Sequence, residues 1–256
     1  MTTLYEHPLS PYAQKVKIAL YEKGVKFDLQ MPNLLGGDEE FARVSPRREV
    51  PALVDDGNTI FDSTIILEYI EDRWPTPPLL PAEPAARARV RMIEEVCDTY
   101  YEAINWAAFE IQIFKRASGA LADELLKRGA TQRAGVNAWL ERQLGDQPWF
   151  NGKQFGWGDL SAVPVVAASA VVGDPVKGRL AAWLARASER PSVKTTLDAA
   201  AAVMPSFDQV GQLVSSGMFK REYRDHRLEW MIRSGGAQIV LDGIQKNNIR
   251  FSNEPS

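Results

Sequence analysis

The chain has 256 residues, which is long enough for one large or two medium-sized domains with a substantial buried core. Hydrophobic residues make up 45% and charged residues 25%, and the net charge is −3, so the composition is globular and lacks the basic surface that nucleic acids require. A single cysteine, Cys97, excludes an internal disulfide and any multi-cysteine metal site, and it fits a reducing compartment. Because no secretory signal and no membrane-spanning apolar run are visible, we expect a cytoplasmic protein without a membrane partner.

The first part of the chain predicts alternating strands and helices. A short strand over Thr2–Glu6 is followed by a helix over Pro11–Lys23, which Gly24 ends. A second strand is expected over Lys26–Met31 and a short helix over Asp38–Arg43.

A hairpin and a third helix come next. The strands Ala52–Val54 and Thr59–Phe61 are joined by an Asp-Gly-Asn turn, whose residues tolerate positive φ. Ser63 is the expected N-cap of the following helix, which ends near Trp74. The order strand, helix, strand, helix, hairpin, helix is the thioredoxin-like α/β pattern.

A proline-rich segment separates this part from a helical one. Residues 75–84 contain five prolines in ten residues, too many for a helix or a sheet. We expect a thioredoxin-like domain over 1–80, an all-helical domain over 85–204 and a C-terminal extension over 205–256, which makes the fold class α/β plus all-α. The helices are predicted at 84–117, 120–144, 157–172, 177–189 and 192–203.

The segment before and after the hairpin can bind an extended peptide with an amino-acid head group. Val50 can pair with a ligand main chain, while Pro51, which can adopt the cis form, sets the bend. The helix that begins near Ser63 attracts a carboxylate through its free amide groups and dipole, and Asp62 can hold an ammonium group. Taken alone, Asp62-Ser63 is also an ordinary helix cap.

These residues resemble a known family. Val50-Pro51-Ala52-Leu53 followed by Asp62-Ser63 is similar to the thioredoxin-like half of cytosolic glutathione transferases, in which a Val-Pro pair and an acidic-Ser pair bind glutathione. The resemblance extends in element order over residues 1 to about 204. It implies glutathione as co-substrate, no metal, and a homodimer.

Ser10 is the predicted catalytic residue. On its own, Ser10 before Pro11 is a helix N-cap. Ser10-Pro11-Tyr12 also resembles the Ser-Pro-aromatic motif of serine-type bacterial glutathione transferases, whose serine donates a hydrogen bond to the glutathione thiolate. Tyr5 is the rival donor, because tyrosine-type members carry theirs at the end of the first strand. Tyr12 is expected either at the substrate or at the seam between the domains.

Glu49 departs from the family pattern. Relatives commonly have Lys or Gln immediately before the Val-Pro pair, and this side chain contacts the glycyl carboxylate of glutathione. The acidic side chain of Glu49 is unfavourable beside a carboxylate unless it turns away. We expect Glu49 to lie at this subsite and Arg47 or Arg48 to take over the contact, unless the arginines are simply solvated loop charges.

The first long helix carries the candidates for the electrophile pocket. A continuous face runs from Tyr100 to Phe109 at helical spacing, and most such stripes are core. In the family that this chain resembles, the matching helix faces the cleft above the thiol, so Tyr101, Asn105 and Phe109 are expected in the substrate pocket. One or two turns earlier lie Glu94, Glu95 and Asp98. Relatives often use an acidic side chain at this position to contact the γ-glutamyl amine of glutathione across a dimer interface. The alternative is that these three residues form a solvated helix face.

Two further segments are expected to be structural. In Asn151–Leu160, which is similar to the family's buried capping segment, Gly156 occupies the cap position and Asp159 keeps only the acidic half of the capping box. In the extension, Tyr223–Glu229 is a charged cluster with a His-Asp pair, which is expected to be an exposed ion-pair face because no nucleophile or metal spacing accompanies it. The extension is expected to cover the cleft or a dimer edge.

The sequence thus predicts an enzyme that activates the glutathione thiolate for attack on a hydrophobic electrophile. Glutathione-dependent β-ether cleavage, dehalogenation or peroxide reduction would use the same residues. A non-enzymatic interaction protein with a glutathione transferase fold is the alternative from a different class. Glu49 and the long extension favour it, whereas Ser10, Val50-Pro51 and Asp62-Ser63 oppose it.

Overall fold

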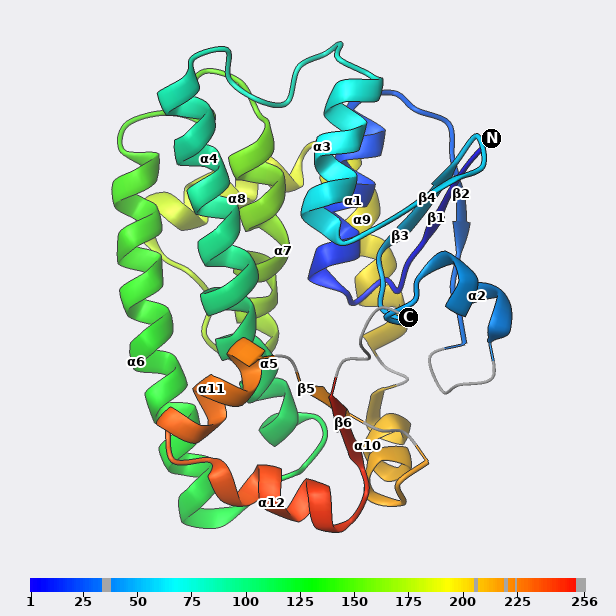
Figure 1. Ribbon diagram of the computed structural model, residues 1–256. Coiled ribbons are helices and arrows are strands. Elements are labelled where there is room, and N and C mark those ends of the chain that lie inside the picture. Colours follow the sequence, from blue (N-terminus) through cyan, green and yellow to red (C-terminus); the bar gives the residue numbers. More distant parts are fainter. Residues whose placement is uncertain (34–37, 205–206, 219–220, 224, 252–256) are drawn as a thin grey trace.

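The computed structural model describes residues 1–33, 38–204, 207–218, 221–223 and 225–251 (Figure 1). A small sheet with its helices forms one side of the molecule, and a bundle of longer helices forms the other (Figure 1). Among the described helices, none is both long and apolar enough to cross a membrane.

The sheet has four strands in the order β2-β1-β3-β4. β1 runs parallel to β2 and antiparallel to β3, and β3 and β4 form the predicted hairpin. This mixed sheet, with the helices α1 and α2 between its strands and α3 after the last of them, confirms the thioredoxin-like fold. The bounds are β1 (Thr2–Tyr5), α1 (Pro11–Glu22), β2 (Asp28–Gln30), α2 (Glu39–Val44), β3 (Ala52–Asp55), β4 (Asn58–Phe61) and α3 (Ser63–Arg73).

The second part is helical, as predicted. Its first long helix is not uniform, because a π-helical segment separates α4 from α5. The bounds are α4 (Pro84–Val96), η1 (Cys97–Tyr101), α5 (Glu102–Gln112), α6 (Gly119–Leu144), α7 (Trp157–Val171), α8 (Gly178–Ser188) and α9 (Pro191–Val203).

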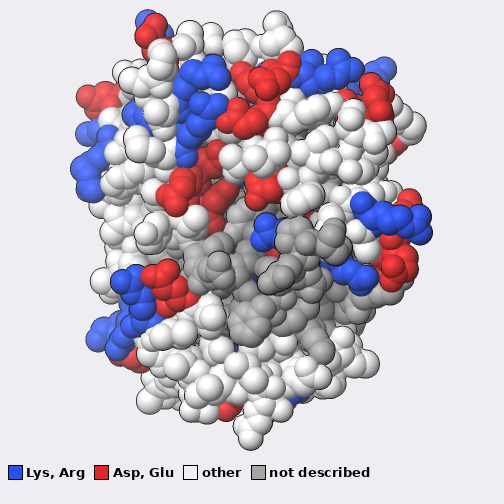
Figure 2. Space-filling model, in the orientation of Figure 1, with Lys and Arg blue, Asp and Glu red and all other residues white. Residues whose placement is uncertain are grey.

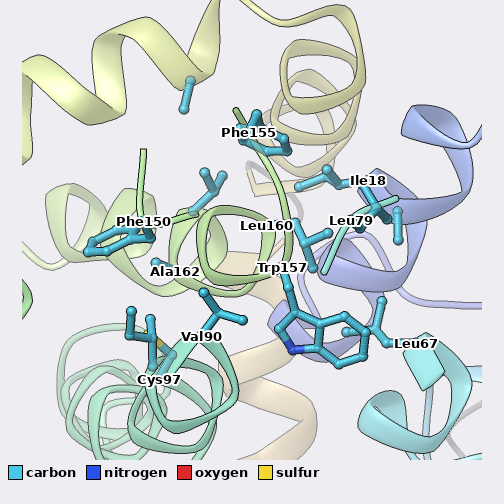
Figure 3. Close-up of a cluster of buried hydrophobic side chains, with 14 of the residues drawn as sticks. Ile18, Leu67, Leu79, Val90, Cys97, Phe150, Phe155, Trp157, Leu160 and Ala162 are labelled. Atoms are coloured by element: carbon cyan, nitrogen blue, oxygen red, sulfur yellow. The ribbon is translucent and has the colours of Figure 1, made fainter. Parts of the chain in front are cut away.

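One hydrophobic core joins the two parts. Figure 3 shows Trp157 and Leu160 of α7 among side chains from the neighbouring helices, such as Ile18 of α1 and Val90 of α4. The indole of Trp157 is fully buried. Cys97 belongs to the same core, and burial raises the pKa of its thiol well above the usual value, so Cys97 is a packing residue and not a nucleophile.

The start of α7 is held by two side chains. Asp159 accepts hydrogen bonds from the backbone amides of Phe150 (2.9 Å) and Gly156 (3.1 Å) and from the Trp183 indole (2.8 Å). Burial raises the pKa of this carboxyl group to about 6. Gly156 contributes no side chain to the box, but the Asn151 carboxamide replaces it by accepting from the Gly158 amide at 2.9 Å. The prediction that only the acidic half of the box remains is therefore correct, and Asn151 supplies the missing half.

The extension folds against the bundle. Its elements are α10 (Phe207–Ser215), β5 (Arg221–Tyr223), α11 (Asp225–Arg233), α12 (Ala237–Gln245) and β6 (Ile249–Phe251). Met231, Ile239 and Val240 form a second buried cluster with residues of α5 and α6, such as Trp106.

The charged cluster of the extension is only partly exposed. Arg227 pairs with the buried Glu102 of α5 at 2.6 Å, which is at odds with an entirely exposed ion-pair face, while Glu229 and Arg233 form an exposed pair. The side chains of residues 223–226 lie outside the described residues, so the predicted His-Asp pair is not described.

Candidate functional site

A cavity of about 310 Å³ lies between the sheet part and the helical bundle. Its walls come from the loop before β3, from the start of α3, and from one face of α4 and η1, with Tyr12 of α1 between them. The lining residues are Tyr12, Ser45, Arg47, Glu49, Val50, Pro51, Phe61, Asp62, Ser63, Thr64, Arg91, Glu94, Glu95, Asp98 and Thr99.

The loop before β3 presents an unused stretch of backbone to this cavity. The Val50–Pro51 peptide is cis, as the sequence suggested. The hydroxyl of Ser45 bridges the Glu49 backbone, accepting from its amide at 3.2 Å and donating to its carbonyl at 3.0 Å. Within the described residues, the backbone amide and carbonyl of Val50 make no hydrogen bond. An extended ligand main chain can therefore pair with Val50 as an added strand would.

The start of α3 forms the adjacent wall. Asp62, and not Ser63, is the N-cap: its Oδ1 accepts from the amides of Thr64 (3.0 Å) and Ile65 (3.3 Å), so the predicted cap was wrong by one residue. Asp62 has φ 73°, in the left-handed region that Asp tolerates better than most side chains. Because the cap is supplied by Asp62, the Ser63 hydroxyl has no partner among the described residues and lies at a helix N-terminus, where a carboxylate binds well.

A buried ion-pair network forms the floor of the cavity. Lys15 of α1 is only 1% exposed, and its ammonium group contacts Glu94 at 2.6 Å and also pairs with Asp98. The Thr64 hydroxyl donates to Glu94 at 2.9 Å, and the Trp157 indole donates to the other oxygen of that carboxylate. Such pairs hold α1, α3 and α4 in one arrangement, because removing a partner leaves a buried charge.

The cavity is rich in carboxylates. Burial raises the pKa of Asp98 to about 6, despite the neighbouring Lys15. Glu94, Glu95, Asp62 and Glu49 line the same space, and Figure 2 shows acidic groups gathered near the centre of this face. The predicted acidic group on α4 therefore faces a cavity of its own chain and can meet an ammonium group without a second subunit.

Ser10 lies at the N-cap of α1. Its Oγ accepts from the Ala13 amide at 3.3 Å, and its hydroxyl proton has no partner among the described residues. Ser10 is not among the residues that line the cavity, whereas Tyr12 lines it and donates to the Asp98 carbonyl at 2.8 Å across the seam between the two parts.

Tyr5 points elsewhere. It is 5% exposed, its ring stacks on Phe41 of α2 with centroids 5.7 Å apart, and burial and the nearby Glu40 raise the pKa of its hydroxyl.

The charged residues before Val50 divide into two groups. Arg47 lines the cavity and pairs with Glu49 at 3.3 Å, so the acidic side chain is neutralised within the loop. Arg48 instead pairs with Glu39 of α2 at 3.4 Å and does not line the cavity.

The predicted electrophile-pocket residues do not line this cavity. Tyr101 is buried, and its hydroxyl donates to Asn137 of α6 at 2.7 Å. Asn105 is buried between the Val165 carbonyl and the Arg133 guanidinium, and Phe109 is half-buried farther along α5. Tyr101, Ile104, Asn105 and Ala108 are all buried, so the predicted face is part of the core, while Tyr100 is 64% exposed.

Comparisons with known proteins identify the family. Residues 4–78 match the model of the glutathione S-transferase N-terminal domain, and residues 123–186 match the model of the C-terminal domain. Glutathione S-transferase U28 of Arabidopsis thaliana is 30% identical over 197 residues, covering 73% of this chain and 84% of the plant protein. The chain belongs to the glutathione S-transferase family.

Two further similar proteins are an isomerase and a bacterial glutathione S-transferase of known structure. Maleylacetoacetate isomerase of Rattus norvegicus is 44% identical over 98 residues, which are 36% of this chain and 45% of the isomerase. A glutathione S-transferase of Methylobacterium radiotolerans, crystallised in complex with glutathione sulfonate, is 31% identical with a TM-score of 0.65 and covers 76% of this chain and 93% of that chain.

Sequence reasoning missed several residues of the site. Five of them line the cavity, namely Ser45, Phe61, Thr64, Arg91 and Thr99, and the sixth, Lys15, pairs with the lining residues Glu94 and Asp98. Lys15 follows Tyr12 by three residues and precedes Ala19 by four, so it shares their buried face of α1. A lysine on a buried helical face, together with Glu94 near the end of α4 and Asp98 four residues later in η1, is the pattern that could have revealed the network.

Proposed function

We propose that this protein binds glutathione in the cavity between its two parts and activates the thiol for attack on a hydrophobic electrophile. The observation that carries the proposal is the unpaired Val50 backbone beside the unpaired Ser63 hydroxyl, at one wall of a cavity whose opposite wall is acidic. Glutathione carries the complementary groups: a main chain for Val50, a carboxylate for Ser63 and an ammonium group for the acidic wall.

The γ-glutamyl end would lie at the start of α3. Its carboxylate would accept from the Ser63 hydroxyl and from the Ser63 amide, because Asp62 already caps the amides of Thr64 and Ile65. Its ammonium group would face Asp62 or Asp98, and the cysteinyl main chain would pair with Val50. Arg47 is the cation that could meet the glycyl carboxylate, once it turns from Glu49.

The thiol would lie near Ser10. There the serine hydroxyl would donate to the sulfur, and the N-terminus of α1 would favour its negative charge. Each unit by which the thiol pKa falls corresponds to about 1.4 kcal/mol of preference for the thiolate. The thiolate would then form a carbon–sulfur bond with the electrophile, and a leaving group would depart with the bonding pair or the adduct would take up a proton. No metal is required for this step.

The class of electrophile is the finer part of the proposal. Aryl halides, enones, epoxides, β-aryl ethers and hydroperoxides are all attacked by a thiolate, and the similarity to an isomerase adds cis-trans isomerisation of an unsaturated acid to this set. A homodimer is also proposed, on family resemblance, and sedimentation measures it.

Replacing Ser10 tests the activation. We expect Ser10→Ala to raise the pKa of bound glutathione by about one to two units and to lower kcat/KM for an aryl halide about tenfold to a hundredfold, since the thiolate loses a donor. Ultraviolet absorbance of the thiolate against pH measures the first effect. Tyr5→Phe is the matched control and should leave the thiol pKa unchanged.

Two results would contradict the proposal in different ways. An unchanged thiol pKa in Ser10→Ala would remove Ser10 from the reaction. Calorimetry without detectable glutathione binding at millimolar concentration would favour the interaction protein over the enzyme.

A further inference from the structure

A second cavity, of about 270 Å³, lies inside the helical part and shares no lining residue with the first. It is enclosed by α5, by the middle of α6, by the turn after α7 and by one residue of α11, which crosses the bundle here (Figure 1). The lining residues are Ile104, Ala108, Gln112, Leu125, Leu126, Gly129, Ala130, Arg133, Val172, Gly173, Asp174 and Trp230.

Most of this wall is aliphatic, yet it contains a buried cation. Arg133 of α6 is 3% exposed. Its Nε donates to Asn105 at 3.1 Å, and its Nη1 donates to Asp174 at 2.7 Å. The Asp174 side chain is 43% exposed, so the neutralising carboxylate is at the mouth of the cavity and the guanidinium is inside.

The guanidinium is not fully used. It carries five N–H donors, and in the described part of the chain Nη2 makes no hydrogen bond. Nη2 is accessible to solvent, and Arg133 lines the cavity, so this donor is available to a ligand there.

We propose that this cavity is a binding site for a small amphipathic carboxylate, such as a medium-chain alkanoate. Its head group would accept from Nη2 of Arg133, and its chain would lie along Ile104, Leu125 and Val172. The charge favours an anionic head over a neutral one, because hydrogen bonds between charged groups are roughly twice as strong. Asp174 opposes the anion, but its exposure lets it turn toward water.

Two features limit the ligand. The cavity is slightly smaller than the roughly 300–1,000 Å³ of most ligand pockets, so the chain must be short. Trp230 comes from the C-terminal extension, so this extension completes the site.

Octanoate is the probe, and calorimetry on the whole chain is the measurement. Gly129→Leu places a side chain in the cavity, and the first added carbon meets only Ile104 Cγ2 at 3.6 Å, so the helix accepts it. We expect at least a tenfold loss of octanoate affinity. Gly135→Leu is the matched control on the same helix, because it is exposed with nothing within 4 Å of the added carbon and should bind octanoate normally.

Two variants test the head group. Arg133→Met should lose about tenfold in octanoate affinity while 1-octanol binding stays unchanged, and Asp174→Asn should bind octanoate more tightly. Circular dichroism checks that each variant is folded, and Asp174→Asn keeps the test available if Arg133→Met does not fold. Undetectable octanoate binding at millimolar concentration, equal losses in Gly129→Leu and Gly135→Leu, or weaker binding in Asp174→Asn would overturn the proposal.

Discussion

At the scale of single residues, the site is shaped by which polar groups are already paired. Asp62 caps α3 and so leaves the Ser63 hydroxyl available, while Arg47 neutralises Glu49. Lys15 holds Glu94 and Asp98 beneath the proposed γ-glutamyl position. In the proposed binding mode, Ser63 would meet the carboxylate of an amino-acid head group and the acidic side chains of the cavity would meet its ammonium group.

Asp98 predicts a pH dependence of ligand binding. Its pKa is raised to about 6 in the folded protein, so Asp98 is ionised above that pH and loses its charge as the pH falls through it. An ammonium group prefers the ionised form, so affinity for S-methylglutathione, which has no thiol to titrate, should weaken as the pH falls from 7 to 5. Calorimetry across this range measures it. In Asp98→Asn the decline should be smaller, and an identical pH profile in the variant would show that another group is responsible.

The same carboxyl group affects folding with a definite sign. Because its pKa is higher in the folded than in the unfolded chain, the folded state binds the proton more tightly between about pH 4 and 6. The contribution of Asp98 to stability is therefore present at low pH and is lost as the pH rises through about 6.

At the scale of elements, the sequence predicted order and type better than caps and helix continuity. The hairpin, α6 and α7 follow from turn residues and apolar spacing, which are local properties. The exact cap of α3 did not follow, because Asp62 and Ser63 are both good caps and the backbone conformation at Asp62 decides between them. The π-helical segment and the burial of Lys15 depend on contacts between helices that are far apart in the sequence, which local patterns do not encode.

The Asn151 side chain gives a test at this scale. It accepts from the Gly158 amide at 2.9 Å and donates to the Leu79 carbonyl at 2.6 Å, so it joins the start of α7 to the segment that connects the two parts. Asn151→Ala should lower the free energy of unfolding by about 1–3 kcal/mol, because the Gly158 amide loses its acceptor, while the Leu79 carbonyl keeps the Trp157 amide as a donor at 2.8 Å. Denaturant unfolding measures this. Lys153→Ala, an exposed change in the same loop, should have little effect, and equal effects of the two changes would exclude the capping role.

At the scale of the whole molecule, the extension is part of the helical bundle. Arg227 pairs with the buried Glu102 and lies over the Trp106 ring, with its guanidinium carbon 5.1 Å from the centroid. The expected roles of the extension over the cleft or at a dimer edge stay predictions, whereas its contacts with α5 and α6 are a feature of the fold.

Arg227→Ala should therefore destabilise the protein. The change leaves the Glu102 carboxylate buried without its guanidinium partner, which costs about 3–5 kcal/mol for a buried pair and less here because Arg227 keeps some exposure. Thermal unfolding measures the effect. Arg233→Ala removes an exposed i,i+4 pair on the same helix and should change stability by less than about 0.5 kcal/mol. Similar losses in both variants would contradict this account of the extension.

The central claim is that glutathione lies along Val50 with its sulfur beside Ser10. A crystal structure with bound glutathione tests it most directly. The account predicts hydrogen bonds between the cysteinyl main chain and the Val50 backbone, the γ-glutamyl carboxylate at Ser63, and the sulfur within hydrogen-bond distance of the Ser10 hydroxyl. A sulfur far from Ser10, or a cavity filled by the protein's own side chains, would contradict it.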